Sequence, residues 1–117
     1  MKPLELASKY LEIFFGDGSV EPMIDLFQPN MVFEGPFFQG LSAREYVDSL
    51  KADPPSNSRY KILSSYETES SACVIYKFSK YDVSTTMVQQ FEVSESKISK
   101  ILLVFDTGVK NRLGWRR

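Results

Sequence analysis

Apolar side chains recur at a helical spacing over the first fifteen residues of the chain. Positions 4, 6, 7, 10, 11, 13, 14 and 15 are apolar, and glycines follow at 16 and 18. A period near 3.6 residues predicts a helix from about residue 3 to residue 15. Ser19 suits a helix N-cap, so a short second helix is expected, ending at the Pro-Asn pair of residues 29–30. Its apolar face would comprise Met23, Ile24, Leu26 and Phe27.

A short strand and a third helix are expected next. Residues 31–34 fit a strand that leads into a Gly-Pro turn at 35–36. Ser42 and Glu45 are three residues apart, the spacing of a capping box. This pair predicts a helix that continues to about residue 50.

The pattern changes from helical to extended after the linker ADPPSNS. Four strands fit the remainder, at about 59–69, 72–81, 85–94 and 98–106, with short polar turns between them. Successive strands with short turns most simply form an antiparallel meander. Helices followed by such a sheet predict an α+β fold, with three N-terminal helices packed on one face of a curved, mainly antiparallel sheet.

Length and charge narrow the functional classes. A chain of 117 residues fits one domain, 1–117, and 43% hydrophobic with 25% charged residues is typical of a globular protein. The net charge of −1 lacks the positive field that nucleic-acid binding uses, so no nucleic-acid partner is expected. Residues 108–117 are expected to form a basic C-terminal tail, because KNRLGWRR holds four cations and no anion.

Residue types that are missing limit the chemistry further. The chain has no histidine, which removes Ser-His-Asp and Cys-His arrangements, histidine bases and histidine-ligated metals. No metal site and no cofactor are expected. The single cysteine, Cys73, forms no intrachain disulfide and is expected to be a small buried hydrophobe. No apolar run approaches the roughly 18 residues of a membrane span, so a cytoplasmic protein without a membrane partner is expected.

The order of these segments resembles the NTF2-like superfamily, in particular its SnoaL-like and ketosteroid-isomerase-like branch. The matching segments are KYLEIFFGDGSVEPMIDLF, NMVFEGPFFQG, LSAREYVDSL and MVQQFEVSESKISKILLVFD, which together cover about residues 4–107. The resemblance implies a cone, in which the curved sheet wraps the first helix around an apolar pocket. Members of the family often pair through the outer face of the sheet. The fold hosts many reactions and also proteins without any, so it implies no single function.

The resemblance also assigns roles to individual positions. In ketosteroid isomerases a helix tyrosine and a late-strand aspartate donate hydrogen bonds to the forming enolate, and an aspartate before a proline moves the proton. Tyr10 stands at the position of the helix tyrosine, and Gln89 at that of the late-strand acid. Gly35, before Pro36, stands where the base is expected. Isomerisation by that mechanism is therefore not expected.

Two carboxylates are candidates for acid–base catalysis. Glu34 lies one position from the expected base, and alternation along a strand would turn it to the other face unless the Gly-Pro turn re-aims it. A solvated strand end is the alternative. Asp106 closes the run ILLVFD, and desolvation would raise its pKa if it points inward. The alternative role for Asp106 is to satisfy a neighbouring turn.

Aromatic and polar side chains on the predicted inner faces are candidates for ligand contact, because apolar linings with few polar groups are typical of small-molecule pockets. The predicted ligand-binding residues are Tyr10, Phe14, Phe33, Phe38, Met87, Gln89, Phe91 and Phe105. The other face of the late strands carries Val88 and Gln90, which Tyr76 and Phe78 are expected to extend into an apolar surface for a homodimer.

Three functions remain open. The first is binding of a small apolar or aromatic molecule in a conical pocket. The second is a cyclase or isomerase that uses a pocket carboxylate with Tyr10 and Gln89 as hydrogen-bond donors. The third is a dimeric interaction module whose hollow is filled by its own side chains.

Overall fold

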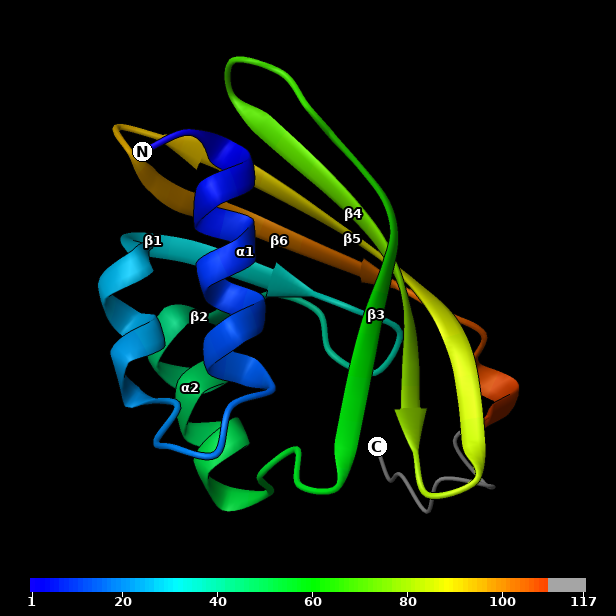
Figure 1. Cartoon of the computed structure of the whole chain (residues 1–117). Helices are drawn as coiled ribbons and strands as arrows, with labels where there is room; N and C mark the ends of the chain where they lie inside the picture. Colours follow the sequence, from blue (N-terminus) through cyan, green and yellow to red (C-terminus); the bar gives the residue numbers. More distant parts are fainter. Residues whose placement is uncertain (110–117) are drawn as a thin grey trace.

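The computed structural model describes residues 1–109 as an α+β fold with a curved six-stranded sheet (Figure 1). The helices are α1 (Pro3–Phe14) and α2 (Ala43–Ala52), with short 3₁₀ turns η1 (Glu21–Leu26) and η2 (Thr107–Val109). The strands are β1 (Phe27–Glu34), β2 (Leu41–Ser42), β3 (Ser58–Glu67), β4 (Ser71–Lys80), β5 (Val83–Ser94) and β6 (Lys97–Val104). Of the expected basic tail, residues 110–117 lie outside the described part.

The predicted first helix is confirmed as α1, which lies against the inner face of the sheet (Figure 1). Pro3 occupies its first turn, where a missing N–H is tolerated. Leu6, Ala7, Tyr10 and Leu11 form its buried stripe and join the hydrophobic core. The helical period therefore places the hydroxyl-bearing side chain of Tyr10 on the face that meets the sheet.

The prediction of a second helix that stops at residues 29–30 is wrong. The helical part is the single 3₁₀ run η1, and β1 already begins at Phe27 and continues through Pro29 and Asn30. The pairing of β1 with β6 shifts register between Phe27 and Val32, so the proline lies in an irregular part of the ladder. A strand tolerates proline at such a bulge, because no regular ladder bond requires its missing N–H.

The predicted capping box is confirmed at the start of α2. The Ser42 Oγ accepts a hydrogen bond from the Glu45 N–H at 3.2 Å, and the Ser42 N–H donates to Glu45 Oε1 at 2.9 Å. The two bonds give partners to backbone N–H groups at the start of the helix, where no intrahelical carbonyl is available to accept from them. The cap fixes the start of α2 and hence the direction in which Tyr46, in its first turn, points.

The four predicted strands are confirmed as the meander β3–β4–β5–β6, with ends within two residues of the predicted ones. The strand order is β2-β1-β6-β5-β4-β3, and β1 pairs with β6 in parallel while the other neighbours are antiparallel. The parallel pair joins the N-terminal segment to the end of the meander. The sheet thereby curves around α1 from both sides (Figure 1).

Burial alternates along β4 and shows which side chains face the helices. Ala72, Val74, Tyr76 and Phe78 are buried, whereas Lys77 is exposed. The expectation that Tyr76 and Phe78 extend an outer apolar surface is therefore wrong. Successive strand residues point to opposite faces, and these two share the inner face with Val74.

Candidate functional site

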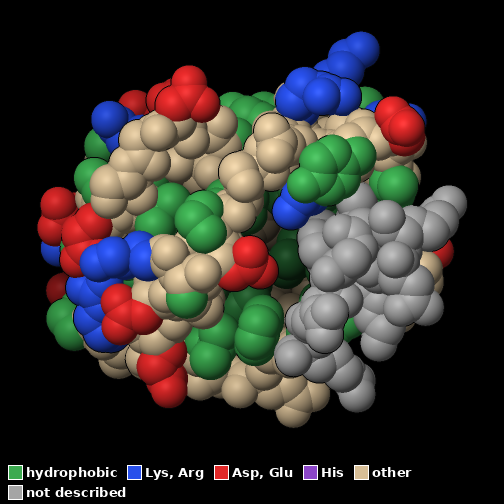
Figure 2. Space-filling model, turned by 90° about the horizontal axis from the view of Figure 1, so that it is seen from below, with side chains coloured by type: hydrophobic (Ala, Val, Ile, Leu, Met, Phe, Trp, Pro, Cys, Tyr) green, Lys and Arg blue, Asp and Glu red, His purple; other side chains and the backbone are tan. Residues whose placement is uncertain are grey.

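An apolar pocket of about 210 Å³ lies between α1, α2 and the inner face of the sheet. Seen from below, hydrophobic side chains gather around this hollow, with acidic and basic side chains beside it (Figure 2). Seven of the predicted ligand-binding residues line it: Tyr10, Phe14, Phe33, Phe38, Met87, Gln89 and Phe105. The eighth, Phe91, does not line it. Phe91 is fully buried in the core, where its ring meets the Tyr10 ring edge-on at a centroid distance of 5.3 Å.

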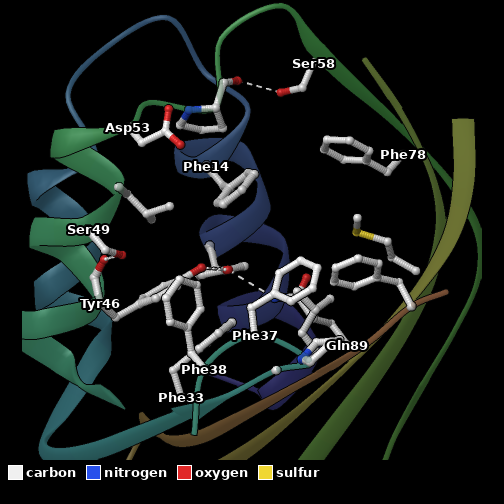
Figure 3. A pocket seen from close by; sticks show the side chains of 18 of the residues that line it. Phe14, Phe33, Phe37, Phe38, Tyr46, Ser49, Asp53, Ser58, Phe78 and Gln89 are labelled. Atoms are coloured by element: carbon white, nitrogen blue, oxygen red, sulfur yellow. Dashed lines mark hydrogen bonds between the residues drawn. The ribbon is translucent and has the colours of Figure 1, made fainter. Parts of the chain in front are cut away.

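A buried chain of hydrogen bonds runs along the pocket wall (Figure 3). The Tyr76 hydroxyl donates to Gln89 Oε1 at 2.8 Å, and Gln89 Nε2 donates to the Tyr10 hydroxyl at 3.0 Å. The Tyr10 hydroxyl is in turn hydrogen-bonded to the hydroxyl of Tyr46. α1, α2, β4 and β5 each contribute one member of this chain, which we call the tyrosine–glutamine network.

The network has more protons than internal acceptors. Tyr10 and Tyr46 carry two hydroxyl protons but share one hydrogen bond, so one O–H of the pair is left over in either direction of donation. Gln89 Nε2 has two N–H groups and donates one of them to Tyr10. Every buried side-chain nitrogen and oxygen of the described residues has at least one hydrogen-bond partner, so the network has two spare donor hydrogens and no unpartnered atom. These two hydrogens can donate to an oxygen acceptor in the pocket.

Burial keeps the three tyrosines of the network neutral. Burial raises the pKa of Tyr10 to about 12, and its hydrogen bonds to Tyr46 and Gln89 offset only part of that effect. Burial, and then the proximity of Tyr10, raises the pKa of Tyr46 and of Tyr76 well above the usual range. At neutral pH the network consequently supplies hydrogen-bond donors and no phenolate base.

Aromatic rings form the walls around this network. The Phe33 ring stacks on Tyr46 at a centroid distance of 4.1 Å, and Phe37 meets Phe105 edge-on at 5.6 Å. The first contact joins β1 to α2, and the second joins the loop after β1 to the residue that follows β6. Because aromatic side chains bring large apolar area with few rotatable bonds, they make a preformed hydrophobic lining.

The position that the family resemblance assigns to a base carries no side chain. Gly35 lines the pocket, and a Cβ added there would lie 3.3 Å from Cε1 of the Phe33 ring. This contact is tight, so Phe33 would have to shift slightly to admit even a methyl group. At Gly35 the pocket wall therefore consists of the backbone and of the Phe33 ring beside it.

The two predicted catalytic carboxylates do not line the pocket. Glu34 pairs with Leu102 across β1 and β6, on the face opposite its neighbour Phe33, which is buried on the inner face. Asp106 is exposed, and its Oδ1 accepts a hydrogen bond from the Gly108 N–H at 2.9 Å. Each side chain thus adopts the alternative arrangement: a carboxylate at a strand end for Glu34, and a turn cap for Asp106.

Sequence reasoning missed three polar members of the site. Tyr46 lies within the predicted third helix and Tyr76 was assigned to the outer face of the sheet, so neither hydroxyl was counted as part of the pocket. Asp53, which ends α2 and lines the pocket, was hidden in a linker whose composition indicates only a loop. No sequence pattern marks Asp53 as a pocket residue; its place as the C-cap of α2 is seen only in the structure.

The outer face of the sheet, opposite α1 and α2, carries an apolar strip. Cross-strand pairing places Ile75 beside Val88 and Val88 beside Val104, with Leu102 on the same face. Val104 is 50% exposed. Cys73 lies half-buried next to this strip, since it pairs with Gln90, and so it is not the fully buried hydrophobe expected from its neighbours.

Within residues 1–109, no group of three or more Cys, Asp or Glu side chains is arranged to hold a metal ion. In the same part of the chain, no helix has both the length and the apolar character needed to cross a bilayer.

Comparison with known proteins identifies the fold. No family model matches the sequence, and no curated protein matches it either. Among solved structures, an NTF2-like protein of unknown function from Cytophaga hutchinsonii is similar, with a TM-score of 0.74, 14% identity and coverage of 97% of this chain and 96% of that one. A SnoaL-like protein from Agrobacterium tumefaciens has a TM-score of 0.69, 15% identity and coverage of 89% and 97%. TerC, co-crystallised with polyporic acid, has a TM-score of 0.75, 15% identity and coverage of 95% and 96%. The protein therefore has the NTF2-like fold.

Proposed function

We propose that the protein binds a small apolar or aromatic molecule in its pocket and holds an oxygen atom of that molecule on the tyrosine–glutamine network. The observation that carries the proposal is the surplus of buried donors: one O–H of the Tyr10–Tyr46 pair and one N–H of Gln89. A ligand carbonyl or hydroxyl oxygen would accept these bonds in a site from which water is largely excluded. The co-crystallisation of TerC with polyporic acid supports the use of this fold for a small organic molecule.

An acid–base reaction is not proposed. Glu34 and Asp106 lie outside the lining, and the network tyrosines are held neutral. A hollow filled by its own side chains is disfavoured by the cavity of about 210 Å³. Binding is therefore the function that the described geometry supports best.

A matched pair of probes tests the proposal. Acetophenone carries a carbonyl oxygen, and isopropylbenzene has nearly the same shape without it. Loss of the network donors is expected to reduce the preference for acetophenone about tenfold, which corresponds to one hydrogen bond of about 1.4 kcal/mol. The double variant Tyr10→Phe/Tyr46→Phe removes both hydroxyls but leaves the two N–H groups of Gln89 as donors. The triple variant that adds Gln89→Leu removes these as well. The ratio of the two dissociation constants, measured by titration calorimetry, is therefore expected to fall in the double variant and to fall furthest in the triple variant.

The exposed Tyr81→Phe serves as the control, because Tyr81 is 63% exposed and does not line the pocket. Circular dichroism establishes that each variant is folded. An unchanged ratio in the folded triple variant would contradict the proposal, as would the absence of binding by either probe.

We also propose that two copies of the chain pair through the outer face of the sheet. The apolar strip of Ile75, Val88, Leu102 and Val104 would be covered in such a dimer. The family resemblance favours a second copy as the partner, because members of the family often pair through this face of the sheet. Three outer-face cations, Arg59, Lys61 and Lys77, lie toward β3, and Glu34 lies toward β1. Glu92 is opposite Lys100 on the same face.

Val104→Lys places a charge within the strip and is expected to convert the dimer to monomer, as measured by light scattering over a concentration series. Ser84→Lys adds the same charge on the same face, away from the strip, and is expected to leave the dimer intact. A monomeric wild-type chain at all concentrations would refute the pairing.

A further inference from the structure

Two charged residues line the pocket among the described residues, and they differ in what surrounds them. Lys80 places its Nζ over the ring of Tyr81, 5.9 Å from the centroid. Tyr81 is largely exposed and does not line the pocket. The ammonium group of Lys80 is therefore engaged away from the hollow, and its stem forms part of the wall.

Asp53 is the other charged residue of the lining. It is the C-cap of α2, and its backbone N–H donates to the Ser49 carbonyl at 3.1 Å. Asp53 is exposed, and its carboxylate makes no ion pair or hydrogen bond with another described residue. The C-terminal end of a helix carries a partial negative charge from its carbonyl groups. Asp53 and the end of α2 thus combine two negative contributions at the same part of the pocket.

Figure 3 shows how this negative group is arranged relative to the hydrogen-bonding network. Asp53 and Ser58 lie at one end of the view, Tyr46 and Gln89 lie toward the other, and the ring of Phe14 is between them. A ligand that fills the pocket therefore meets donors at one end, an aromatic wall in the middle and a carboxylate at the other end. Aromatic walls attract cations as well as apolar groups.

The cavity volume limits the size of such a ligand. Drug-sized ligands occupy pockets of about 300–1,000 Å³, whereas this one measures about 210 Å³. One aromatic ring with a short side chain suits that volume better than a fused ring system. The short side chain would then reach from the ring to the Asp53 end.

We propose that Asp53 selects the ligand class: the pocket takes a single-ring aromatic amine, with an oxygen substituent on the tyrosine–glutamine network and its ammonium group against the Asp53 carboxylate. This inference rests on the proposed binding function and adds to it the positively charged end of the ligand. Asp53 acts as a specificity-determining residue, because it separates an amine from otherwise similar phenols or ketones.

Three probes that share a para-substituted phenol test the assignment. Tyramine carries an ammonium group, 4-ethylphenol carries none, and 3-(4-hydroxyphenyl)propanoate carries a carboxylate instead. Tyramine is expected to bind roughly fivefold more tightly than 4-ethylphenol, and the propanoate more weakly than both. Asp53→Asn is expected to abolish the advantage of tyramine while the dissociation constant of 4-ethylphenol stays the same. Added salt is expected to shrink the advantage in the wild-type chain.

Asp48→Asn is the matched control, since Asp48 is an exposed carboxylate on the same helix that does not line the pocket. It is expected to keep the wild-type ranking of all three probes. Equal affinities of tyramine and 4-ethylphenol, or a tyramine advantage that survives in Asp53→Asn, would overturn the role of Asp53. Tighter binding of the propanoate than of tyramine would overturn it as well and assign this end to Lys80. Failure of 4-ethylphenol to bind would instead contradict the proposed function, because that probe reports only on the oxygen-holding end.

Discussion

Replacement of Phe91 by alanine is expected to lower the free energy of unfolding by about 3–5 kcal/mol. Phe91 is fully buried on β5, with Ala72 and Ile101 as its cross-strand neighbours and the Tyr10 ring against its own. Its removal loses the burial of a large ring and leaves a cavity that the rigid sheet and α1 cannot close. Urea denaturation followed by circular dichroism measures the change.

Phe38→Ala is the matched control for this prediction. Phe38 is 41% exposed in the loop after β1, so its truncation is expected to cost less than about 1 kcal/mol. Similar losses for the two variants would contradict the assignment of Phe91 to the core and of Phe38 to the rim of the pocket.

The second large effect is expected at alkaline pH, where ionisation of the buried tyrosines lowers the free energy of unfolding of the protein. Folding raises the pKa of Tyr10 from 10 to about 12, because burial disfavours the phenolate. A raised folded-state pKa leaves the stabilisation complete below the unfolded value, and stability falls as the pH rises from about 10 toward 12. Tyr10 alone accounts for a loss of about 2 kcal/mol over that interval, because the full effect of about 3 kcal/mol is reached only when the pH lies above the folded-state pKa. Tyr46 and Tyr76, whose pKa values are raised in the same direction, add to the loss.

The measurement is the free energy of unfolding in urea at a series of pH values from neutral to strongly alkaline. The contribution of the tyrosines to the free energy of unfolding is expected to stay constant up to about pH 10 and to fall at higher pH. Tyr10→Phe lacks the titrating hydroxyl, so its decline is expected to be shallower. A decline in Tyr10→Phe as steep as in the wild-type chain would exclude Tyr10 as the cause.

Local signals in the sequence predicted most of the fold correctly. The helical period of residues 4–15, the Ser42–Glu45 capping box and the period-two strands all depend on neighbours within a few residues. The error at residues 29–30 has a different origin. Pro29 indicates the end of a helix when only its neighbours are considered, yet β6 accommodates it at an irregular part of the ladder. That partner lies about seventy residues further along the chain, so local reasoning does not find it.

The site residues were predictable where the helical or strand period determines which way a side chain points, as for Tyr10 on α1 and Gln89 on β5. The alternation of β1 likewise turns Glu34 to the outer face, as its position in the strand indicated. The direction of Asp106 was not predictable from the strand pattern, because the turn at Gly108 holds its side chain. The hydroxyl of Tyr46 becomes part of the site only because α2 packs opposite α1, and a single sequence does not specify that packing.

The parallel pairing of β1 with β6 has a consequence for how the chain is made on the ribosome. β1 is complete at residue 34, but its long partner begins at residue 97. Until then only the two-residue β2 pairs with it, so one edge of β1 stays open until β6 has been synthesised. Open strand edges invite pairing with other nascent chains. A chain that stops before residue 97 would expose this edge permanently, which makes truncated products of this protein the species most prone to aggregate.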